Sequence, residues 1–362
     1  MGRILGLQDV EAAIRGGSVF AAGGGGWAEH GRMLGTAAVS IGHPELVSMD
    51  EVPDDAWIAT AAAIGAPAGT TQWQMLGVDY VKAVEMLQDA LGEPVYGLMI
   101  GQNGMSSTMN AWLPGALLGT KVVDAVGDIR AHPTGDMGSI GMAGSPEATI
   151  QVAVGGHRDS HSYIELVVRG ATAKISPILR KAADMSGGFI ASCRNPARAS
   201  YVKKNAALGG ISRALELGRA IMAAEAGGGE AVIDAICRTT SGTILGKGTV
   251  TRKAVNYTEA AFDIGTLTIR CGQRDLVLHV MNEYMAVESG DGDRLATFPD
   301  VITTLGSDGR PMSVGHIQEG NELSVFHIAK AHLPLSSSVK DPAVYPVCEA
   351  ALGIPIARYA LA

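Results

Sequence analysis

Two carboxylates, a guanidinium and an imidazole lie close together in the sequence, directly after a run of β-branched residues. The four side chains are Asp124, Asp128, Arg130 and His132. A carboxylate or an imidazole can take a proton from water, and a cation can stabilise the oxyanion that forms when water attacks. The loop after a buried strand is also where α/β proteins usually bind ligands. We therefore predict that this segment carries chemistry, the alternative being an ion pair between Asp128 and Arg130 that only shapes a turn.

A run of consecutive glycines is the second segment of interest. It consists of Gly23, Gly24, Gly25 and Gly26. We predict a strand before it, over residues 18–22, and a helix after it, over residues 27–38. Backbone N–H groups in such a loop can bind an anion at the helix N-terminus, although no lysine of the P-loop type follows. Glycines also permit tight turns and close packing, so both interpretations stay open. Glu29 and His30 come next and would extend a polar site onto the helix.

Two further pairs of polar residues stand where predicted strands end. Gln102 and Asn103 follow a strand predicted over residues 95–100, and their amides would read the carbonyl or N–H groups of a ligand ring. The alternative is an Asx turn that caps the next helix. Asn282 and Glu283 lie between two β runs, and a glutamate there is costly to bury unless it is paired. The pair would hold a domain interface or face the active cleft.

The sequence does not predict a metal site or a cofactor. His157, Asp159 and His161 alternate as strand ligands would, but Gly155-Gly156 and Asp159-Ser160 favour an exposed hairpin turn. The cysteines are widely spaced and form no C-x-x-C pair: Cys193, Cys237, Cys271 and Cys348. This spacing is typical of reduced, buried thiols rather than of disulfides or a zinc site. We therefore expect a cytoplasmic protein.

Composition limits the classes of partner. The chain has 362 residues, of which 47% are hydrophobic and 18% charged, so it can bury a large core. Its formal net charge of -8 argues against nucleic acid as a partner. No apolar run reaches the roughly 18 residues of a membrane span. We expect a small-molecule substrate, no membrane, and, from the apolar content and Gly/Ala-rich helices, a homo-oligomer.

Two kinds of pattern divide the chain. Up to about residue 165, strand-like runs at 46–49, 57–62, 95–100 and 121–123 alternate with helical patterns at 79–90 and 107–118. Such alternation is typical of an α/β domain with a mainly parallel sheet. From residue 166 to 362, two helices at 175–183 and 211–225 precede short strands between Gly/Asp-rich turns. This half is predicted to be a helix-plus-β domain with a mostly antiparallel sheet.

Several segments also occur in an order that is characteristic of one family. These are Ala22–Gly26, Ala63–Pro67, Leu118–Pro133, Ser186–Gly188, the helix over 212–219, Asn282-Glu283 and Phe298–Ile302. Together they resemble the S-methyl-thiohydantoin desulfurase-like family over nearly the whole chain. The resemblance implies an α/β domain followed by a largely β domain. It also implies hydrolysis at a hydantoin-like five-membered ring, with C–S or C–N cleavage, and association with hydantoinase/oxoprolinase-type enzymes.

On this resemblance we assign roles to the clustered polar residues. Asp124 or Asp128 would activate water, Arg130 with N–H groups of the glycine run would stabilise the tetrahedral charge, and His132 or Glu29 would protonate the leaving atom. The alternative is a non-catalytic subunit that binds a ligand and partners a hydantoinase-type enzyme. Lost carboxylates favour this alternative: Val126 stands where the family usually has an aspartate.

Overall fold

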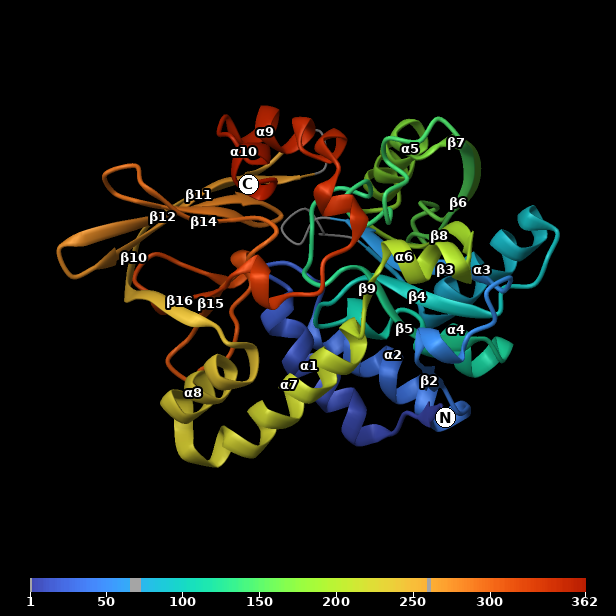
Figure 1. Cartoon of the computed structure of the whole chain (residues 1–362), viewed down its shortest axis with the longest axis horizontal. Coiled ribbons are helices and arrows are strands. Elements are labelled where there is room, and N and C mark those ends of the chain that lie inside the picture. The colour runs from blue at the N-terminus through green and yellow to red at the C-terminus, as the bar shows by residue number, and fades with distance from the viewer. Residues whose placement is uncertain (1, 66–72, 259–261) are drawn as a thin grey trace.

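The computed structural model describes residues 2–65, 73–258 and 262–362. Ala66 and Pro67 of the segment Ala63–Pro67 lie outside the described residues. The chain forms two sheets, each with its own helices, and the predicted fold class is confirmed (Figure 1). The helices are α1 (Leu7–Phe20), α2 (Ala28–Ile41), α3 (Gly77–Leu91), α4 (Trp112–Leu118), α5 (Thr172–Met185), α6 (Ala199–Asn205), α7 (Gly210–Ala224), α8 (Gly228–Thr240), α9 (Pro346–Leu352) and α10 (Ala357–Ala360).

The first sheet is mixed, with a parallel centre. Its order is β1-β2-β5-β4-β3-β8-β6-β7, and β9 pairs with β5. The strands are β1 (Arg3–Ile4), β2 (Glu45–Val47), β3 (Trp57–Gly65), β4 (Gly97–Gln102), β5 (Lys121–Asp128), β6 (Ala148–Gly155), β7 (Ile164–Ala171), β8 (Phe189–Arg198) and β9 (Ala207–Leu208). Pairs β2–β5, β5–β4 and β4–β3 are parallel. The carboxyl ends of β3, β4 and β5 therefore meet at one edge, where an α/β sheet usually binds its ligand.

The segment before the glycine run is a helix, and the strand predicted over residues 18–22 is wrong. Helix α1 continues through Gly16 and Gly17 to Phe20. Both glycines lie where another segment of the chain comes very close to the helix. A Cβ on Gly16 would overlap the backbone carbonyl of Ala214 on α7, and one on Gly17 would overlap the carbonyl of Gly104. Close packing thus favours glycine inside this helix, and the glycine run connects α1 to α2 rather than following a strand.

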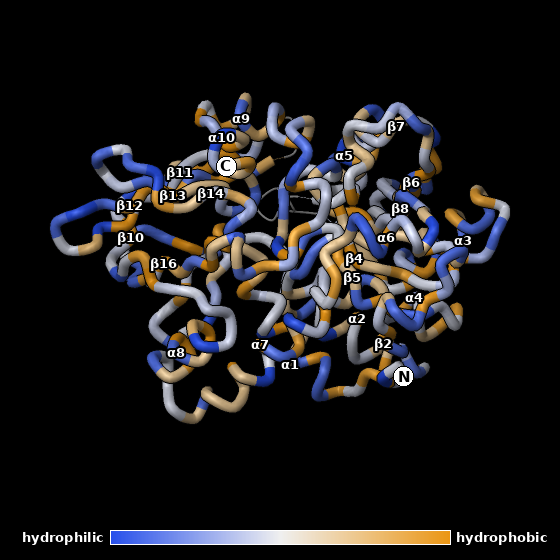
Figure 2. The backbone as a smooth tube through the Cα atoms, viewed as in Figure 1, coloured by the Kyte–Doolittle hydropathy of each residue, from blue (hydrophilic) through white to orange (hydrophobic). Residues whose placement is uncertain are grey.

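The second sheet is antiparallel throughout, with the order β14-β13-β12-β11-β10-β16-β15. Its strands are β10 (Thr243–Tyr257), β11 (Asp263–Cys271), β12 (Arg274–Met281), β13 (Glu283–Ser289), β14 (Arg294–Thr297), β15 (Val301–Leu305) and β16 (Glu322–Ile328). Leu267, Leu278 and Val325 are fully buried in its core. Figure 2 shows hydrophilic residues at the outlying turns of this sheet. Met281, Met285 and Ala286 are buried in a separate cluster with α9, so the strands β12 and β13 are covered on both faces.

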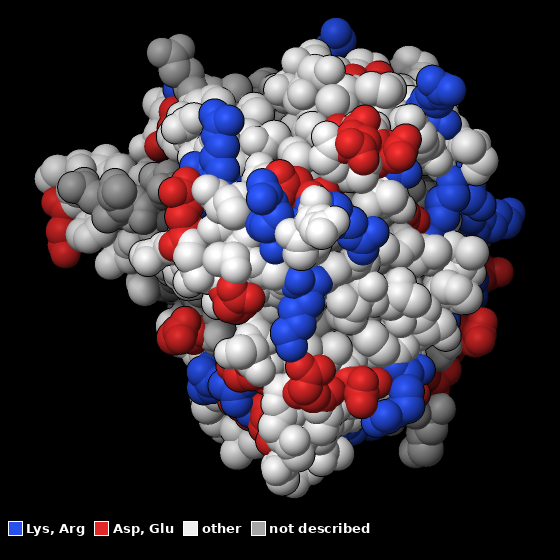
Figure 3. Space-filling model, turned by 90° about the vertical axis from the view of Figure 1, so that its left-hand side faces the viewer, with Lys and Arg blue, Asp and Glu red and all other residues white. Residues whose placement is uncertain are grey.

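The two halves share structure across residue 165. Strand β7 contains that residue, and helix α5 and strand β8 follow it, yet both strands belong to the first sheet and α5 packs on it. As a division of domains, the boundary near residue 165 stays a prediction. Within the described parts of the chain, no helix is both long and apolar enough to cross a membrane. On the face shown in Figure 3, Lys and Arg are interspersed with Asp and Glu. The ion pairs of the described residues include Lys247–Glu230 and Arg270–Asp275.

The contact between α1 and α7 gives a test of the packing. In Gly16→Ala the new Cβ meets backbone of Ala214, which cannot move as a side-chain end could. We expect the free energy of unfolding to fall by about 1–3 kcal/mol, as overpacked cores do. Urea unfolding measures this. In the control Gly315→Ala, the nearest atom is Ser313 Oγ at 3.9 Å, and an equal loss in both variants would contradict the prediction.

Candidate functional site

A small pocket opens at the carboxyl ends of β3, β4 and β5, against the junction of β12 and β13. Its volume is about 50 Å³. Residues from both halves of the chain line it: Gly25, Gly26, Ala63, Ile64, Gly65, Gln102, Ser107, His132, Pro133, Thr134, Arg180, Phe189, Arg194, Asn282 and Glu283. Six of the residues predicted for the site are among them, namely Gly25, Gly26, Gln102, His132, Asn282 and Glu283. The pocket thus brings together segments that are far apart in the sequence.

The glycine run joins the two halves at this pocket. The amide of Tyr284 donates to Ala22 O at 2.8 Å, and that of Val314 donates to Gly23 O at 3.0 Å. A Cβ on Gly24 would overlap the carboxyl of Glu283. Gly23 and Gly24 therefore serve close packing. Gly25 and Gly26 have φ angles of 78° and 82° and line the pocket, so the ligand-contact interpretation applies to this pair.

Glu283 is the buried acid of the pocket. Only 4% of the residue is exposed, and Oε2 has no hydrogen-bond partner among the described residues. Burial raises the pKa of its carboxyl to about 8, although the nearby charges of Arg130 and Arg180 favour the ionised form. The preceding Asn282 has a φ of 57° and is held because its Oδ1 accepts the amide of Asp263 at 2.9 Å. At neutral pH Glu283 is therefore mainly a proton donor.

Two arginines bring positive charge to the same pocket, and the sequence analysis missed both. Arg180 of α5 donates to Pro133 O at 2.6 Å and to Gly65 O at 3.2 Å, and lies over the Phe262 ring. Burial lowers its pKa to about 10, so it stays charged at neutral pH.

Arg194 of β8 is the less satisfied of the two. It is 5% exposed, and its Nε has no partner among the described residues. Its guanidinium lies beside two glycines. A Cβ on Gly135 would stand 2.6 Å from Nη1, and one on Gly101 would stand 3.5 Å from Nη2. Burial lowers the pKa of Arg194, and the charge of Asp136 opposes that shift. The residues that precede it in the strand, Phe189 to Cys193, read as apolar. A guanidinium next to such a run is the sequence feature from which Arg194 could have been predicted.

His132 is a neutral imidazole in this setting. Its backbone amide donates to Gln102 Oε1 at 3.0 Å, and its Nε2 lies 3.4 Å from Gly101 O. Nδ1 has no partner among the described residues. Burial, with the charge of Arg194 next, lowers the pKa of His132 to about 3. When Nε2–H donates to Gly101, Nδ1 is left as an acceptor, so His132 is poorly suited to donate a proton as an imidazolium.

Asp128 and Arg130 do not line the pocket. Both are fully buried. Arg130 donates through Nε to Ala131 O at 2.8 Å and through Nη1 to Asp300 O at 2.9 Å. The structure therefore gives no support to the direct catalytic roles that we predicted for the two residues.

Asp124 and Asn103 hold the scaffold of the pocket. Asp124 Oδ1 accepts the amides of Ile211 and Ser212, at 2.9 and 3.1 Å, and so caps helix α7. Asn103 Nδ2 donates to the carbonyls of Ile129 and Gly210, at 3.0 and 3.1 Å. Neither residue lines the pocket.

Glu29 and His30 begin helix α2 but point to different surroundings. Glu29 is exposed. His30 packs edge-on against Trp73, and its Nε2 lies 3.3 Å from the Tyr80 hydroxyl. Burial lowers the pKa of His30 to about 4. Neither lines the pocket, and Phe189 is the member of this aromatic region that does.

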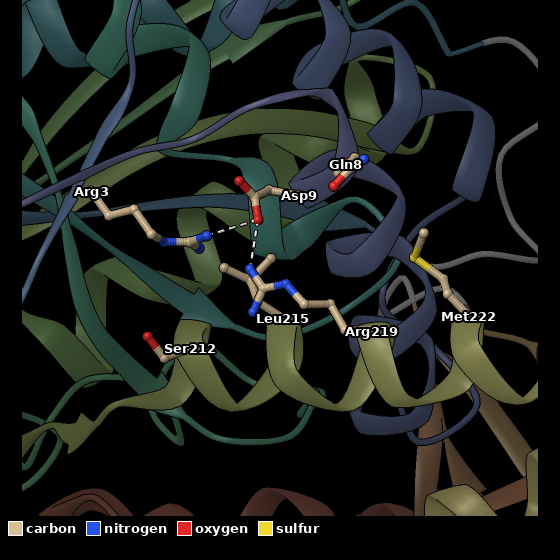
Figure 4. Close-up of a pocket in the computed structure, with 7 residues that line it drawn as sticks. All are labelled: Arg3, Gln8, Asp9, Ser212, Leu215, Arg219 and Met222. Atoms are coloured by element: carbon tan, nitrogen blue, oxygen red, sulfur yellow. Dashed lines mark hydrogen bonds and ion pairs between the residues drawn. The ribbon is translucent and has the colours of Figure 1, made fainter.

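A larger hollow of about 480 Å³ lies outside helices α1 and α7 (Figure 4). Its central charge is Asp9, which accepts from Arg3 at 2.9 Å and from Arg219 at 2.6 Å. The charged groups there satisfy one another, and none of the predicted site residues lines the hollow. The smaller pocket is the better candidate because Glu283 Oε2 and Arg194 Nε in it have no hydrogen-bond partner among the described residues. Over residues 2–65, 73–258 and 262–362, no group of three His, Cys, Asp or Glu is placed to hold a metal ion.

Comparisons with known proteins give a family and a fold. Residues 8–162 match the model of the S-Me-THD-like, N-terminal domain, and residues 171–336 match that of the S-Me-THD-like, C-terminal domain. A crystal structure of a Chromobacterium violaceum protein, a structural-genomics target, is similar with a TM-score of 0.72. The match covers 97% of this chain and 96% of that one at 23% identity, so it shows the shared fold. No curated protein matches the chain.

The burial of Glu283 predicts a pH-dependent stability. An ordinary glutamate in the unfolded chain ionises near pH 4.3, whereas Glu283 keeps its proton in the folded protein up to about pH 8. Between these values unfolding releases a proton, so stability falls as pH rises, by at most about 1.4 kcal/mol per unit. Relative to wild type, Glu283→Gln should therefore gain stability from pH 5 to pH 8. Urea unfolding across this range measures the difference. Glu29→Gln, which changes an exposed glutamate, is the control. A difference in the free energy of unfolding between Glu283→Gln and wild type that stays constant across this pH range would refute the prediction.

Proposed function

The chain belongs to the S-Me-THD-like, or S-methyl-thiohydantoin desulfurase-like, family, and on that premise we propose that it is a hydrolase of S-alkyl thiohydantoins. Water would attack the ring carbon that carries sulfur, and the products would be a hydantoin and a thiol. The observation that carries the proposal is a buried carboxyl, Glu283, in one pocket with two buried guanidiniums. Such a set supplies an acid–base group and charge stabilisation in one place.

Glu283 manages the protons in this reaction. The attacked carbon has a double bond to a ring nitrogen. As the water oxygen bonds to the carbon, that electron pair moves to the nitrogen, which takes the proton of Glu283. The carboxylate then accepts a proton from the added water. When the C–S bond breaks, Glu283 gives this proton to the leaving sulfur. The carbon–oxygen double bond forms as the hydroxyl gives its remaining proton to the Glu283 carboxylate, which returns Glu283 to its acid form. Atoms and charges balance, and the raised pKa of Glu283 keeps it protonated for the first step.

Arg180 and Arg194 stabilise negative charge on the ring. Arg180 is fixed by the carbonyls of Pro133 and Gly65, which suits it to bind a ring carbonyl in one orientation. Arg194 has free donor capacity at Nε. Because an unsatisfied donor on a buried cation is costly, charge that develops on the substrate would relieve that cost only as the reaction proceeds. This is the differential stabilisation that accelerates a reaction.

The remaining polar groups suit a small ring. His132 Nδ1 is an acceptor for a ring N–H or for the attacking water, and the Gln102 amide lies beside it. The N–H groups at Gly25 and Gly26 border the same space. About 50 Å³ is room for roughly three to five water-sized groups. This size supports a five-membered ring as ligand over a nucleotide.

The first test of the proposed activity concerns the acid, Glu283. Glu283→Gln keeps the shape of the side chain but cannot donate and recover a proton. We expect kcat for S-methyl-thiohydantoin to fall about 10²–10⁴-fold, measured as methanethiol release with a thiol reagent. In the wild type, kcat should also fall as pH rises through about 8, because Glu283 then loses its proton. Glu29→Gln is the matched control. Turnover by Glu283→Gln at the wild-type rate would remove Glu283 from the mechanism.

The second test concerns Arg194, the buried cation whose Nε has no hydrogen-bond partner among the described residues. Arg194→Met retains much of the apolar stem and removes the charge. We expect a fall of about 10²–10³ in kcat, as for loss of one donor to an oxyanion. Arg252→Met, on the exposed part of β10, is the control. Product analysis separates C–S from C–N cleavage, since only the first releases methanethiol. Tight binding of the ring compound by folded wild type without any turnover would favour the non-catalytic subunit instead.

A further inference from the structure

One long edge of the first sheet has no partner strand. Strand β7 ends the strand order, and among the described residues it pairs with β6 alone. Its eight residues run beside β6 without a bulge. Figure 1 shows β7 at the outer margin of the sheet, near α5. The unpaired N–H and C=O groups along such an edge can bond to a further strand.

The other terminal strands of the two sheets offer no comparable edge. Strand β1 has two residues and β14 has four. Strand β15 has five residues, all of which are buried. Proteins usually protect sheet edges in these ways, or with proline and lysine, and β7 contains neither residue. A long, regular and open edge suits pairing with a strand of another chain.

The two faces of β7 have different surroundings. One face packs on the apolar cluster that includes Leu179 of α5, and its side chains are those of Ile164, Leu166 and Val168. The alternate residues, Glu165, Val167 and Arg169, are exposed, and Val167 is exposed to 40%. The second face therefore presents an apolar side chain between two side chains of opposite charge.

Neither charge on this face is neutralised within the chain. Glu165 accepts from the Tyr163 hydroxyl at 2.8 Å, and Arg169 donates to the backbone carbonyl of Ala90 near the end of α3. Both partners are uncharged groups. Among the residues that the structure describes, Glu165 and Arg169 form no ion pair. Each of them can therefore take an oppositely charged partner from outside the chain.

We propose that β7 is an interface with a second copy of this chain, whose own β7 pairs with it antiparallel about a two-fold axis at Val167. Opposite residues of an antiparallel pair lie on the same face of the sheet. With the two Val167 residues opposite each other, Glu165 of each copy lies opposite Arg169 of the other. The Cβ atoms of such opposite residues are about 4.5–5.5 Å apart, within reach of an ion pair.

The charges select this register over its neighbours. An axis at Leu166 or at Val168 places both Glu165 and Arg169 opposite uncharged residues, whereas the axis at Val167 forms two ion pairs. The backbone bonds of the edge supply affinity, and the side chains fix the alignment. The first sheets of the two copies then continue into each other. The inference is independent of the proposed hydrolysis, because no residue of β7 lines the pocket.

The test exchanges the charges in the full chain. Sedimentation velocity over a range of concentrations should show a dimer for the wild type. Glu165→Arg and Arg169→Glu each place like charges opposite each other twice in the dimer, so each should raise its dissociation constant about tenfold or more. Asp291→Arg makes the same change of charge as Glu165→Arg at an exposed turn of the second sheet, and as the control it should leave the constant unchanged.

Recombining the charges distinguishes this register from a general effect of charge. The double variant Glu165→Arg/Arg169→Glu restores opposite charges and should dimerise as the wild type does. An equimolar mixture of the two single variants should also form dimers, because one strand then carries two cations and the other two carboxylates. All these substitutions change exposed side chains, and circular dichroism checks that the variants fold.

Three results overturn the inference. The first is a wild type that stays monomeric, and the second is a dimer that neither single variant weakens, which would mean that the copies meet at another surface. The third is a loss of dimer in the single variants that neither the double variant nor the mixture restores. Methanethiol release, measured on the same samples, reports separately on the proposed function.

Discussion

The close approach of strand β13 to the glycine run is the contact on which the site depends. Tyr284 bonds to Ala22, and the carboxyl of Glu283 occupies the space that a side chain on Gly24 would fill. Without that approach, Glu283 would remain with the second sheet, and Arg194 and Arg180 with the first sheet and the helix α5 that packs on it. The need for glycine is therefore steric at Gly24 and conformational at Gly25 and Gly26, where φ is positive. One short loop thus sets both the packing of the halves and the composition of the pocket.

Burial explains why the pKa values of these groups differ from their ordinary values. Taking a charge out of water is expensive unless another charge or hydrogen bond replaces the water. Arg180 is compensated in part by the carbonyls of Pro133 and Gly65, whereas Arg194 has unused capacity. Glu283 avoids the cost by keeping its proton. The pocket thus holds a proton and positive charge ready for a ligand, and the surrounding fold supplies the stability that this arrangement consumes.

Most of the framework and about half of the candidate site could be predicted from the sequence. A physical reason separates the parts that could be predicted from those that could not. Periodicity located β3, β4 and α3 because each depends on nearby residues. It failed at α1, where Gly16 is required by a carbonyl on the distant helix α7. Likewise, polar residues at strand ends identified Gln102, His132 and Glu283. Arg194 escaped because it stands inside an apolar strand, and only its tertiary neighbours show that its guanidinium reaches the pocket.

The segment from Asp124 to His132 does not act as one acid–base set, because each member meets a different element. Asp124 caps α7, Arg130 bonds to the turn at Asp300, and His132 bonds to the end of β4. Of these residues only His132 lines the pocket, and the buried acid there, Glu283, comes from β13. A segment rich in catalytic residue types can therefore serve mainly as the support of a pocket, while a distant strand presents its buried acid.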